Sequence, residues 1–226
     1  MTSSVIAAQL YTLRDYCKTA ADLATTLKKV RQIGYEAVQI SGIGPIDPKD
    51  VAKILEDEQL TCCITHVSLD DMRKNFDAVL EKHRLWNCQY TAVGGFFPQE
   101  KYTRELWEGF IDEYNELAAK FAAQGLQIGY HNHSHEFVRI GDKTIMQMLF
   151  EGLKAPIHFE IDTYWVAHGG ADPVERGVRR GEVDVEQAEG GLDVDPGQPA
   201  QVEARAAGDE GSQVPRRRAR DLRERV

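Results

Sequence analysis

The chain has 226 residues, 42% of them hydrophobic, and a formal net charge of -9. This length and apolar content suit one packed domain, or one domain with a tail. The negative charge repels a phosphate backbone, so we expect no nucleic acid partner. The apolar run at residues 5–8 is too short for a signal sequence or a membrane span, so we expect a soluble, cytoplasmic protein with no membrane partner.

From residue 5 to about residue 173, short apolar runs alternate with longer stretches of helical period. The runs follow one another at steps of roughly 25 to 35 residues, which is the repeat of a βαβ unit. This order predicts an α/β fold with a parallel sheet. The six predicted strands are residues 5–10, 37–40, 61–65, 90–93, 127–130 and 157–161.

The clearest predicted helix covers residues 103–123, because its apolar residues recur at three- and four-residue steps. Two further helices are predicted at residues 20–33 and 70–83. Asp47 and Pro48 open another, with Asp as N-cap and Pro in the first turn. Gly34 and Gly125 follow helix ends, where a left-handed cap is needed.

The four cysteines show no CxxC spacing, and Cys62 and Cys63 lie inside an apolar run. We interpret them as small core hydrophobes, which fits a reducing cytoplasm.

The composition changes abruptly after Val174. Residues 175–226 contain no Lys, His, Cys, Met, Asn, Ile or aromatic residue, and all their basic residues are Arg. Such a segment has too little apolar bulk to offset chain entropy, so we expect a barrel domain at residues 1–174 and a disordered tail. A GC-rich coding region read in a shifted frame has the same bias. We therefore hypothesise a frameshift or truncation near Glu175, which resequencing of the gene tests; a genuine flexible tail is the alternative.

Polar residues follow every predicted strand, at the strand ends where parallel α/β barrels place their active sites. They include Gln9 to Arg14 after the first strand, Gln39 to Gly42 after the second and His66 after the third. Gly94 and Gly95 follow the fourth.

The fifth and sixth strands end in the residues with the most metal-binding character. His131 and His133 are two apart, so both point to one face, and Glu136 is reachable once the chain turns. Asp162 follows the next strand. Imidazole and carboxylate together suit Mn, Zn, Co or Fe, and less often Mg. We predict a divalent metal site at His131, His133, Glu136 and Asp162, although HxH alone also occurs in proteins without metals.

Other residues have a structural and a functional interpretation. His66 is either a hydrogen-bonded strand-end histidine or a group that contacts substrate. Trp165 and Tyr164 are either packing residues or an aromatic floor for a sugar ring. Arg14 is either solvated surface or a receptor for phosphate or carboxylate.

Four segments, QLYTLRD, GYEAVQISG, YHNHSHEF and FEIDTYWVAHGGADP, resemble the sugar phosphate isomerase/epimerase group of the xylose isomerase-like barrels. The resemblance covers about residues 5 to 175. It implies a (β/α)8-type TIM barrel that here stops after about six βα units. It also implies one divalent cation, and Asp162 matches the strand-six aspartate that binds it. His131 occupies the usual strand-five glutamate position, with Glu136 nearby, and His66 matches a histidine that often contacts substrate.

The resemblance also implies a small-molecule sugar substrate and a reaction. Metal would polarise the substrate carbonyl while a carboxylate, for which we select Glu136, removes the neighbouring proton through an enediolate. We expect His66 to assist and Tyr11, Arg14 and Trp165 to bind substrate. Dehydration of a keto-inositol or keto-sugar begins with the same step and stays open.

The family's last two ligands, a strand-seven histidine and a strand-eight glutamate, have no match in the tail, where Glu189 and Asp193 lack an adjacent apolar strand. The chain is therefore either an enzyme or an inactive truncated remnant that self-associates through exposed sheet edges as a homo-oligomer. A third interpretation, DNA repair by an endonuclease IV-type barrel, conflicts with the acidic charge.

Overall fold

The structure is a computed structural model that describes residues 6–99 and 101–173. A six-stranded sheet forms its centre, in the order β1-β2-β3-β4-β5-β8, and every neighbouring pair is parallel. The strands are β1 (Ala7–Gln9), β2 (Ala37–Ile40), β3 (Thr61–His66), β4 (Tyr90–Val93), β5 (Gln127–His131) and β8 (His158–Glu160). All six predicted strands are confirmed within a few residues.

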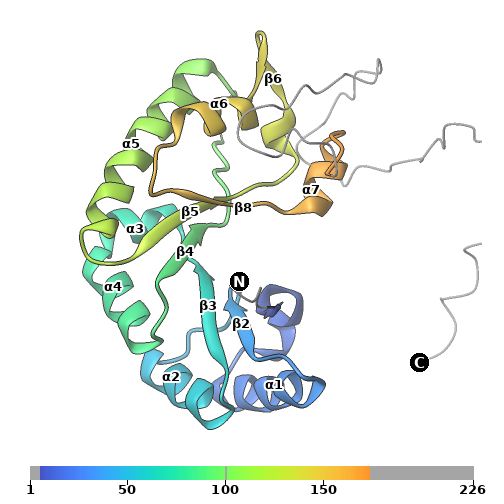
Figure 1. The fold of residues 1–226 in the computed structure, drawn as a ribbon, viewed down its shortest axis with the longest axis vertical. Helices are drawn as coiled ribbons and strands as arrows, with labels where there is room; N and C mark the ends of the chain where they lie inside the picture. Colours follow the sequence, from blue (N-terminus) through green and yellow to red (C-terminus); the bar gives the residue numbers. More distant parts are fainter. Residues whose placement is uncertain (1–5, 100, 174–226) are drawn as a thin grey trace, which may run out of the picture. The chain divides into compact units, whose positions relative to one another are not determined.

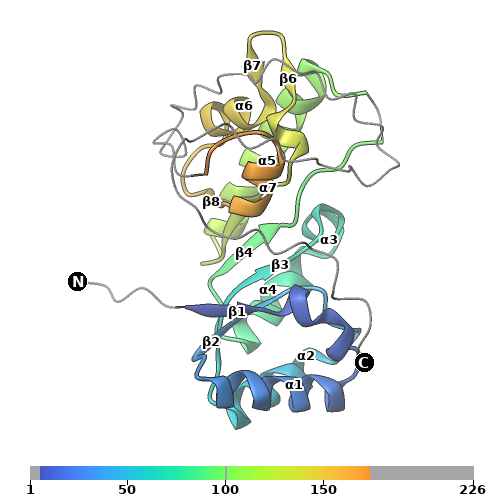
Figure 2. The ribbon, with the colours of Figure 1, turned by 90° about the vertical axis from the view of Figure 1, so that its right-hand side faces the viewer.

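Helices α1, α2, α4 and α5 lie in an arc along one face of the curled sheet (Figure 1). In chain order the helices are the 3-10 helix η1 (Leu10–Tyr16), α1 (Ala20–Ile33), α2 (Pro48–Asp57), α3 (Leu69–Lys74), α4 (Phe76–Leu85), α5 (Arg104–Ala122), the 3-10 turn η2 (His135–Phe137), α6 (Ile145–Gly152) and α7 (Thr163–His168). A two-stranded antiparallel hairpin of β6 (Arg139–Ile140) and β7 (Lys143–Thr144) projects beyond α6 (Figure 2).

Local signals fix the helix ends as predicted. The Asp47 side chain accepts from the Lys49 N–H at 2.8 Å and Pro48 begins α2. Gly34 ends α1 with a left-handed φ of 114°. α1 also begins with a capping box, in which the side chains of Thr19 and Asp22 each accept from the other's backbone N–H.

The single helix predicted at residues 70–83 is wrong in one respect, because the structure has two helices there. Asn75 breaks the run with a non-helical φ of -122°, and its side chain donates to Asp71 at 2.8 Å. An Asn that bonds locally in this way competes with helical backbone hydrogen bonds.

Buried side chains form two hydrophobic clusters. One lies around β4, β5, α5 and α6 and includes Trp107, Phe110 and Tyr114. The other lies around β2, α1 and α2 and includes Leu23, Leu27 and Val38. All four cysteines are free, and Cys17, Cys62 and Cys88 are buried in this second cluster. No helix among residues 6–99 and 101–173 is long and apolar enough to cross a bilayer.

Residues 174–226 lie outside the described residues, and the predictions that concern them stay predictions. These are the disordered tail, the frameshift near Glu175 and the absence of ligands around Glu189 and Asp193.

Candidate metal centre

Three side chains of metal-ligand type meet at the ends of three strands. His66 ends β3, His131 ends β5 and Glu160 ends β8. Because the strands are parallel, these ends lie at one edge of the sheet, and His131 and Glu160 are direct partners in the β5–β8 register. One ligand atom from each lies within 4.8 Å of the other two. We call these three residues the His–Glu cluster; it is the single such group found in the described part of the chain.

The spacing of the cluster fits ligands around one divalent cation. His66 Nε2 lies 3.0 Å from Glu160 Oε2, and His131 Nδ1 lies 3.3 Å from Glu160 Oε1. Ligand atoms about 2.1 Å from a shared cation lie about 3.0 to 3.4 Å from one another. His131 Nδ1 is buried and has no hydrogen-bond partner among the described residues. Two imidazoles and a carboxylate suit Mn, Fe, Co or Zn, so the residues present fit such an ion.

Gln39, from β2, contacts both His66 and Glu160 of the cluster. Its Nε2 lies 2.8 Å from Glu160 Oε1 and 2.8 Å from His66 Nε2. If His66 Nε2 accepts from this amide, its lone pair faces the carboxylate. If His66 Nε2 carries a proton, that proton can bond the Glu160 carboxylate at 3.0 Å while the Gln39 amide donates to Glu160 Oε1. A cation bound by His66 and Glu160 would take the place of this proton.

Glu160 is the anionic member of the cluster. Burial acts to raise the pKa of Glu160, but the imidazoles of His131 and His66 and the amide of Gln39 outweigh burial and hold that pKa well below its usual range. Glu160 is therefore ionised at neutral pH, and its own proton does not satisfy His66.

Asp162 lies beside the cluster on the other side of His131. Its Oδ1 caps α7 by accepting from the N–H groups of Tyr164 and Trp165 at 2.9 and 3.3 Å. Its Oδ2 lies 3.8 Å from His131 Nε2, which is an ion-pair distance and not a hydrogen bond. The fully buried Asn132 fixes the position of Asp162, because it accepts from the Asp162 N–H and donates to the Asp162 carbonyl.

Glu136, which the sequence suggested as both ligand and base, lies outside the cluster. Its side chain has no exposed surface and accepts from the Tyr130 hydroxyl at 2.7 Å and from the His133 N–H at 2.8 Å. Burial raises the pKa of Glu136. These contacts describe a residue that holds the turn after β5, while the predicted chemical roles of Glu136 stay predictions.

His133 lies next to the cluster but is not one of its three members. Its ring centre is 5.0 Å from that of His131 and 5.0 Å from the nearest ring centre of Trp165. Burial, with the nearby His131 and His135, lowers the pKa of His133 to about 4. His133 is therefore neutral at pH 7, and its buried Nδ1 has no partner among the residues described.

The predicted substrate-binding residues surround this strand edge. Trp165 contacts His133, as above. Arg14 donates to the Tyr11 carbonyl at 2.9 Å and its guanidinium lies 4.6 Å from the centre of the Tyr11 ring. Tyr11 is 52% exposed. Nothing in these contacts tests a substrate role, so all three assignments stay predictions.

Sequence reasoning missed Glu160, and it placed Gln39 at a strand end without giving it a role. Glu160 precedes Asp162 by two residues, so the two-residue period of a strand places both on one face. That signal was present in the segment FEID. Gln39 gave a weaker signal, as a polar residue inside the buried run 37–40.

Comparison with solved structures reveals close similarity in fold. A sugar phosphate isomerase/epimerase from Parabacteroides distasonis superposes with a TM-score of 0.67 at 24% identity, over 78% of this chain and 75% of that one. An L-ribulose 3-epimerase superposes with a TM-score of 0.57 at 15% identity, over 75% and 64% of the two chains.

A xylose isomerase domain protein from Salmonella typhimurium matches with a TM-score of 0.55 at 12% identity, over 78% and 68% of the two chains. The fold is that of the xylose isomerase-like TIM barrels. The predicted fold class is thus confirmed, and the six strands of this xylose isomerase-like chain curl into half of a barrel. No family model matches the sequence, and no curated protein does.

Proposed function

We propose that this chain is a divalent-metal-dependent enzyme that isomerises or epimerises a small sugar by removing a proton next to its carbonyl. The His–Glu cluster is the observation that carries the proposal. The similar sugar isomerase and epimerase structures support the sugar as substrate class.

His66, His131 and Glu160 would hold the ion, and Gln39 would orient the Glu160 carboxylate through its 2.8 Å hydrogen bond. A bound divalent ion supplies Lewis acidity, which polarises a carbonyl and an adjacent hydroxyl. Mn, Zn, Co and Fe suit this donor set better than Mg, because two of the three ligands are nitrogen.

Asp162 is the carboxylate beside the cluster that suits proton transfer best. One of its oxygens is fixed by the start of α7, and the other faces the cluster side, with 27% of the side chain exposed. A carboxylate held in this way accepts a proton without first breaking a buried hydrogen bond. Glu136, by contrast, must give up its bonds to Tyr130 and His133.

Metal titration by calorimetry tests the site directly. We expect Mn²⁺ to bind the full chain at one site, and Glu160→Gln to weaken binding about 100-fold or more, because the variant removes the anionic ligand. Glu116→Gln, on the exposed face of α5, is the matched control and should bind as the wild type does. Equal binding by Glu160→Gln and wild type would exclude the cluster as the metal site and favour the inactive-remnant alternative.

Proton exchange tests the chemistry. The metal-loaded protein should exchange the α-hydrogen of a ketose with D₂O, followed by NMR over a panel that includes L-ribulose, because a similar structure is an L-ribulose 3-epimerase. Asp162→Asn keeps the cap on α7 but should abolish exchange while Mn²⁺ affinity stays within about tenfold. Loss of both properties together would instead make Asp162 a metal ligand, as the sequence first suggested. Loss of water from the substrate would identify a dehydratase.

A further inference from the structure

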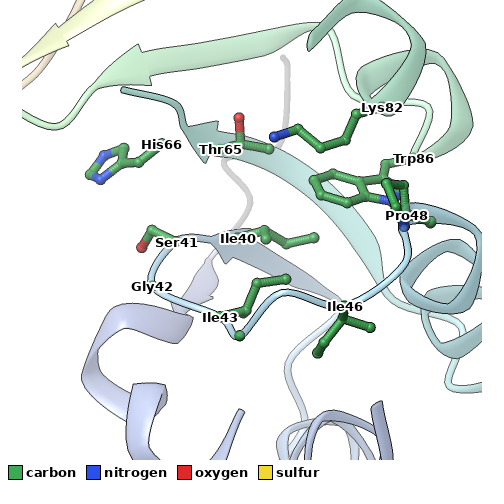
Figure 3. A pocket seen from close by; sticks show the side chains of 11 residues that line it. Ile40, Ser41, Gly42, Ile43, Ile46, Pro48, Thr65, His66, Lys82 and Trp86 are labelled. Carbon is green, nitrogen blue, oxygen red and sulfur yellow. The ribbon is translucent and has the colours of Figure 1, made fainter. Parts of the chain in front are cut away.

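A pocket of about 230 Å³ lies between the carboxyl ends of β2 and β3, the loop at residues 41–48 and helix α4. Figure 3 shows His66 at one end of the pocket and Lys82 and Trp86 at the other, with Ile40 and Ile43 between them. We call it the Lys82 pocket. His66 is the residue that it shares with the His–Glu cluster.

Lys82 brings an uncompensated positive charge to this pocket. Its side chain is half-buried, and burial lowers the pKa of the ammonium. Its nitrogen lies 5.5 Å from the centre of the Trp86 ring, a weak cation–π contact. Lys82 forms no salt bridge within the described part of the chain, and no acidic residue lines the pocket.

Asp71 is the acidic side chain whose charge acts on Lys82 from a distance. Its two oxygens are already bonded, one to the Ser68 hydroxyl at 2.7 Å and the other to the Asn75 amide at 2.8 Å. Asp71 keeps its charge, but it does not line the pocket and forms no ion pair with Lys82 within the described part of the chain. A half-buried cation without a paired anion is costly, and a bound anion would remove that cost.

Ser41 lies at the His66 end of the pocket, in the loop that forms the wall opposite Lys82. Ser41 is 3% exposed, and its hydroxyl has no hydrogen-bond partner among the described residues. The next residue, Gly42, has a φ of 67°, and any side chain there would collide with the Tyr11 ring. Glycine at this position thus lets the loop lie close against the Tyr11 ring.

We propose that the Lys82 pocket binds the acidic group, phosphate or carboxylate, of a sugar whose carbonyl end lies at the His–Glu cluster. This inference rests on the proposed function for the identity of the ligand as a sugar. The pocket itself offers the Lys82 ammonium, and no carboxylate that would repel an anion lines it. Isoleucine side chains beside the ammonium limit water and strengthen its attraction for an anion. The structure thus assigns an acidic sugar as the substrate class.

Calorimetry with three sugars of similar size tests this assignment. D-Fructose 6-phosphate, D-gluconate and D-fructose are titrated into the full chain in EDTA, so that no metal contributes to binding. We expect at least one of the two anions to bind about tenfold or more tightly than D-fructose, since an ion pair adds a charge-assisted hydrogen bond. The order of the two anions distinguishes phosphate from carboxylate, and inorganic phosphate should compete with the preferred one.

Three variants make the test specific. Lys82→Met should remove the preference for the anion, and Lys82→Arg should largely retain it because the charge is kept. Lys120→Met, on the exposed end of α5, should bind as the wild type does. Equal affinity for all three sugars, or an anion preference that survives in Lys82→Met, would overturn the proposal. The sugar titration contains EDTA, so its result does not depend on metal binding. If the anion binds but Mn²⁺ does not bind in the separate metal titration, the proposed metal centre is rejected and the proposed anion pocket is retained.

Discussion

The half of the sheet that carries Gln39 and His66 is packed mainly by aliphatic side chains, whereas the cluster around the half that carries His131 and Glu160 also contains five buried aromatic side chains, Trp107, Phe110, Tyr114, Phe121 and Tyr130. Two of these five are tyrosines whose buried hydroxyls are hydrogen-bonded. The Tyr114 hydroxyl donates to the Gly129 carbonyl at 2.5 Å, and the Tyr130 hydroxyl donates to Glu136. Burial of aliphatic side chains thus packs around β2, while β5 also receives directed hydrogen bonds from buried tyrosine hydroxyls.

This contrast matters for the site because the His–Glu cluster draws on both halves. His66 needs only a rigid strand beneath it. His131 and Asp162 lie at strand ends and in turns, where backbone groups need partners, and there Asn132 and Glu136 supply them. The comparison predicts that the first half is sensitive to lost volume and the second half to lost hydrogen bonds.

The largest effect is expected at Glu136. Glu136→Leu leaves the Tyr130 hydroxyl and the His133 N–H unpaired, so the free energy of unfolding should fall by about 4 kcal/mol, measured by urea denaturation. Glu136→Gln keeps an acceptor and should cost less, with Mn²⁺ affinity unchanged. A tenfold or larger loss of Mn²⁺ affinity in Glu136→Gln would restore Glu136 as a ligand.

Truncation of a buried apolar side chain in the other half should lower the free energy of unfolding slightly less. Leu27 on α1 is fully buried, and Leu27→Ala should lower the free energy of unfolding by about 3 kcal/mol through lost burial and a cavity. Mn²⁺ affinity of the folded variant should stay within about twofold, because no hydrogen bond to the cluster changes. Ala119→Gly, at an exposed position of α5, is the control substitution. It should lower the free energy of unfolding by about 1 kcal/mol through helix propensity alone, which is less than the loss expected for Leu27→Ala.

His83 connects the two halves and predicts a pH dependence. Its Nε2 bonds Thr65 on β3, and Thr65 bonds Thr91 on β4. Burial lowers the pKa of His83 to about 4 from an ordinary value near 6.5. Between these two pKa values the unfolded chain binds a proton at His83 and the folded chain does not. The contribution of His83 to the free energy of unfolding is therefore complete above pH 6.5 and is lost as the pH falls to about 4.

Urea midpoints between pH 7 and pH 4 measure this effect. The wild type should lose about 2 to 3 kcal/mol more than His83→Gln over that range. His168→Gln, at an exposed site on α7, is the control and should follow the wild-type curve. Parallel curves for wild type and His83→Gln would mean that folding does not lower the pKa of His83.

The smallest effect is expected at Tyr114. Tyr114→Phe keeps the aromatic packing and removes only the hydrogen bond to Gly129, so the free energy of unfolding should fall by about 1 to 2 kcal/mol. Hydrogen exchange should quicken along β5 more than along β2. Uniform exchange in both halves would contradict the proposed difference between them.

Much of the fold could be predicted from sequence because its signals are local. The apolar runs fixed the strands, Asp47 and Gly34 fixed helix ends, and the alternation of strand and helix implied a parallel sheet. The break at Asn75 was missed, because a side-chain bond to Asp71 competes with helical periodicity. The hairpin of β6 and β7 was missed because each of its strands has only two residues.

The sequence by itself determined the succession of strands and helices along the chain. It also determined that polar residues, among them His66, His131 and Asp162, lie at the strand ends. Only the tertiary structure decided that Glu160 meets the two histidines and that Glu136 turns into the core toward Tyr130. The reason is that the direction of each side chain after β5 depends on which buried donors need an acceptor. That requirement arises only when strands and helices distant in sequence are packed together.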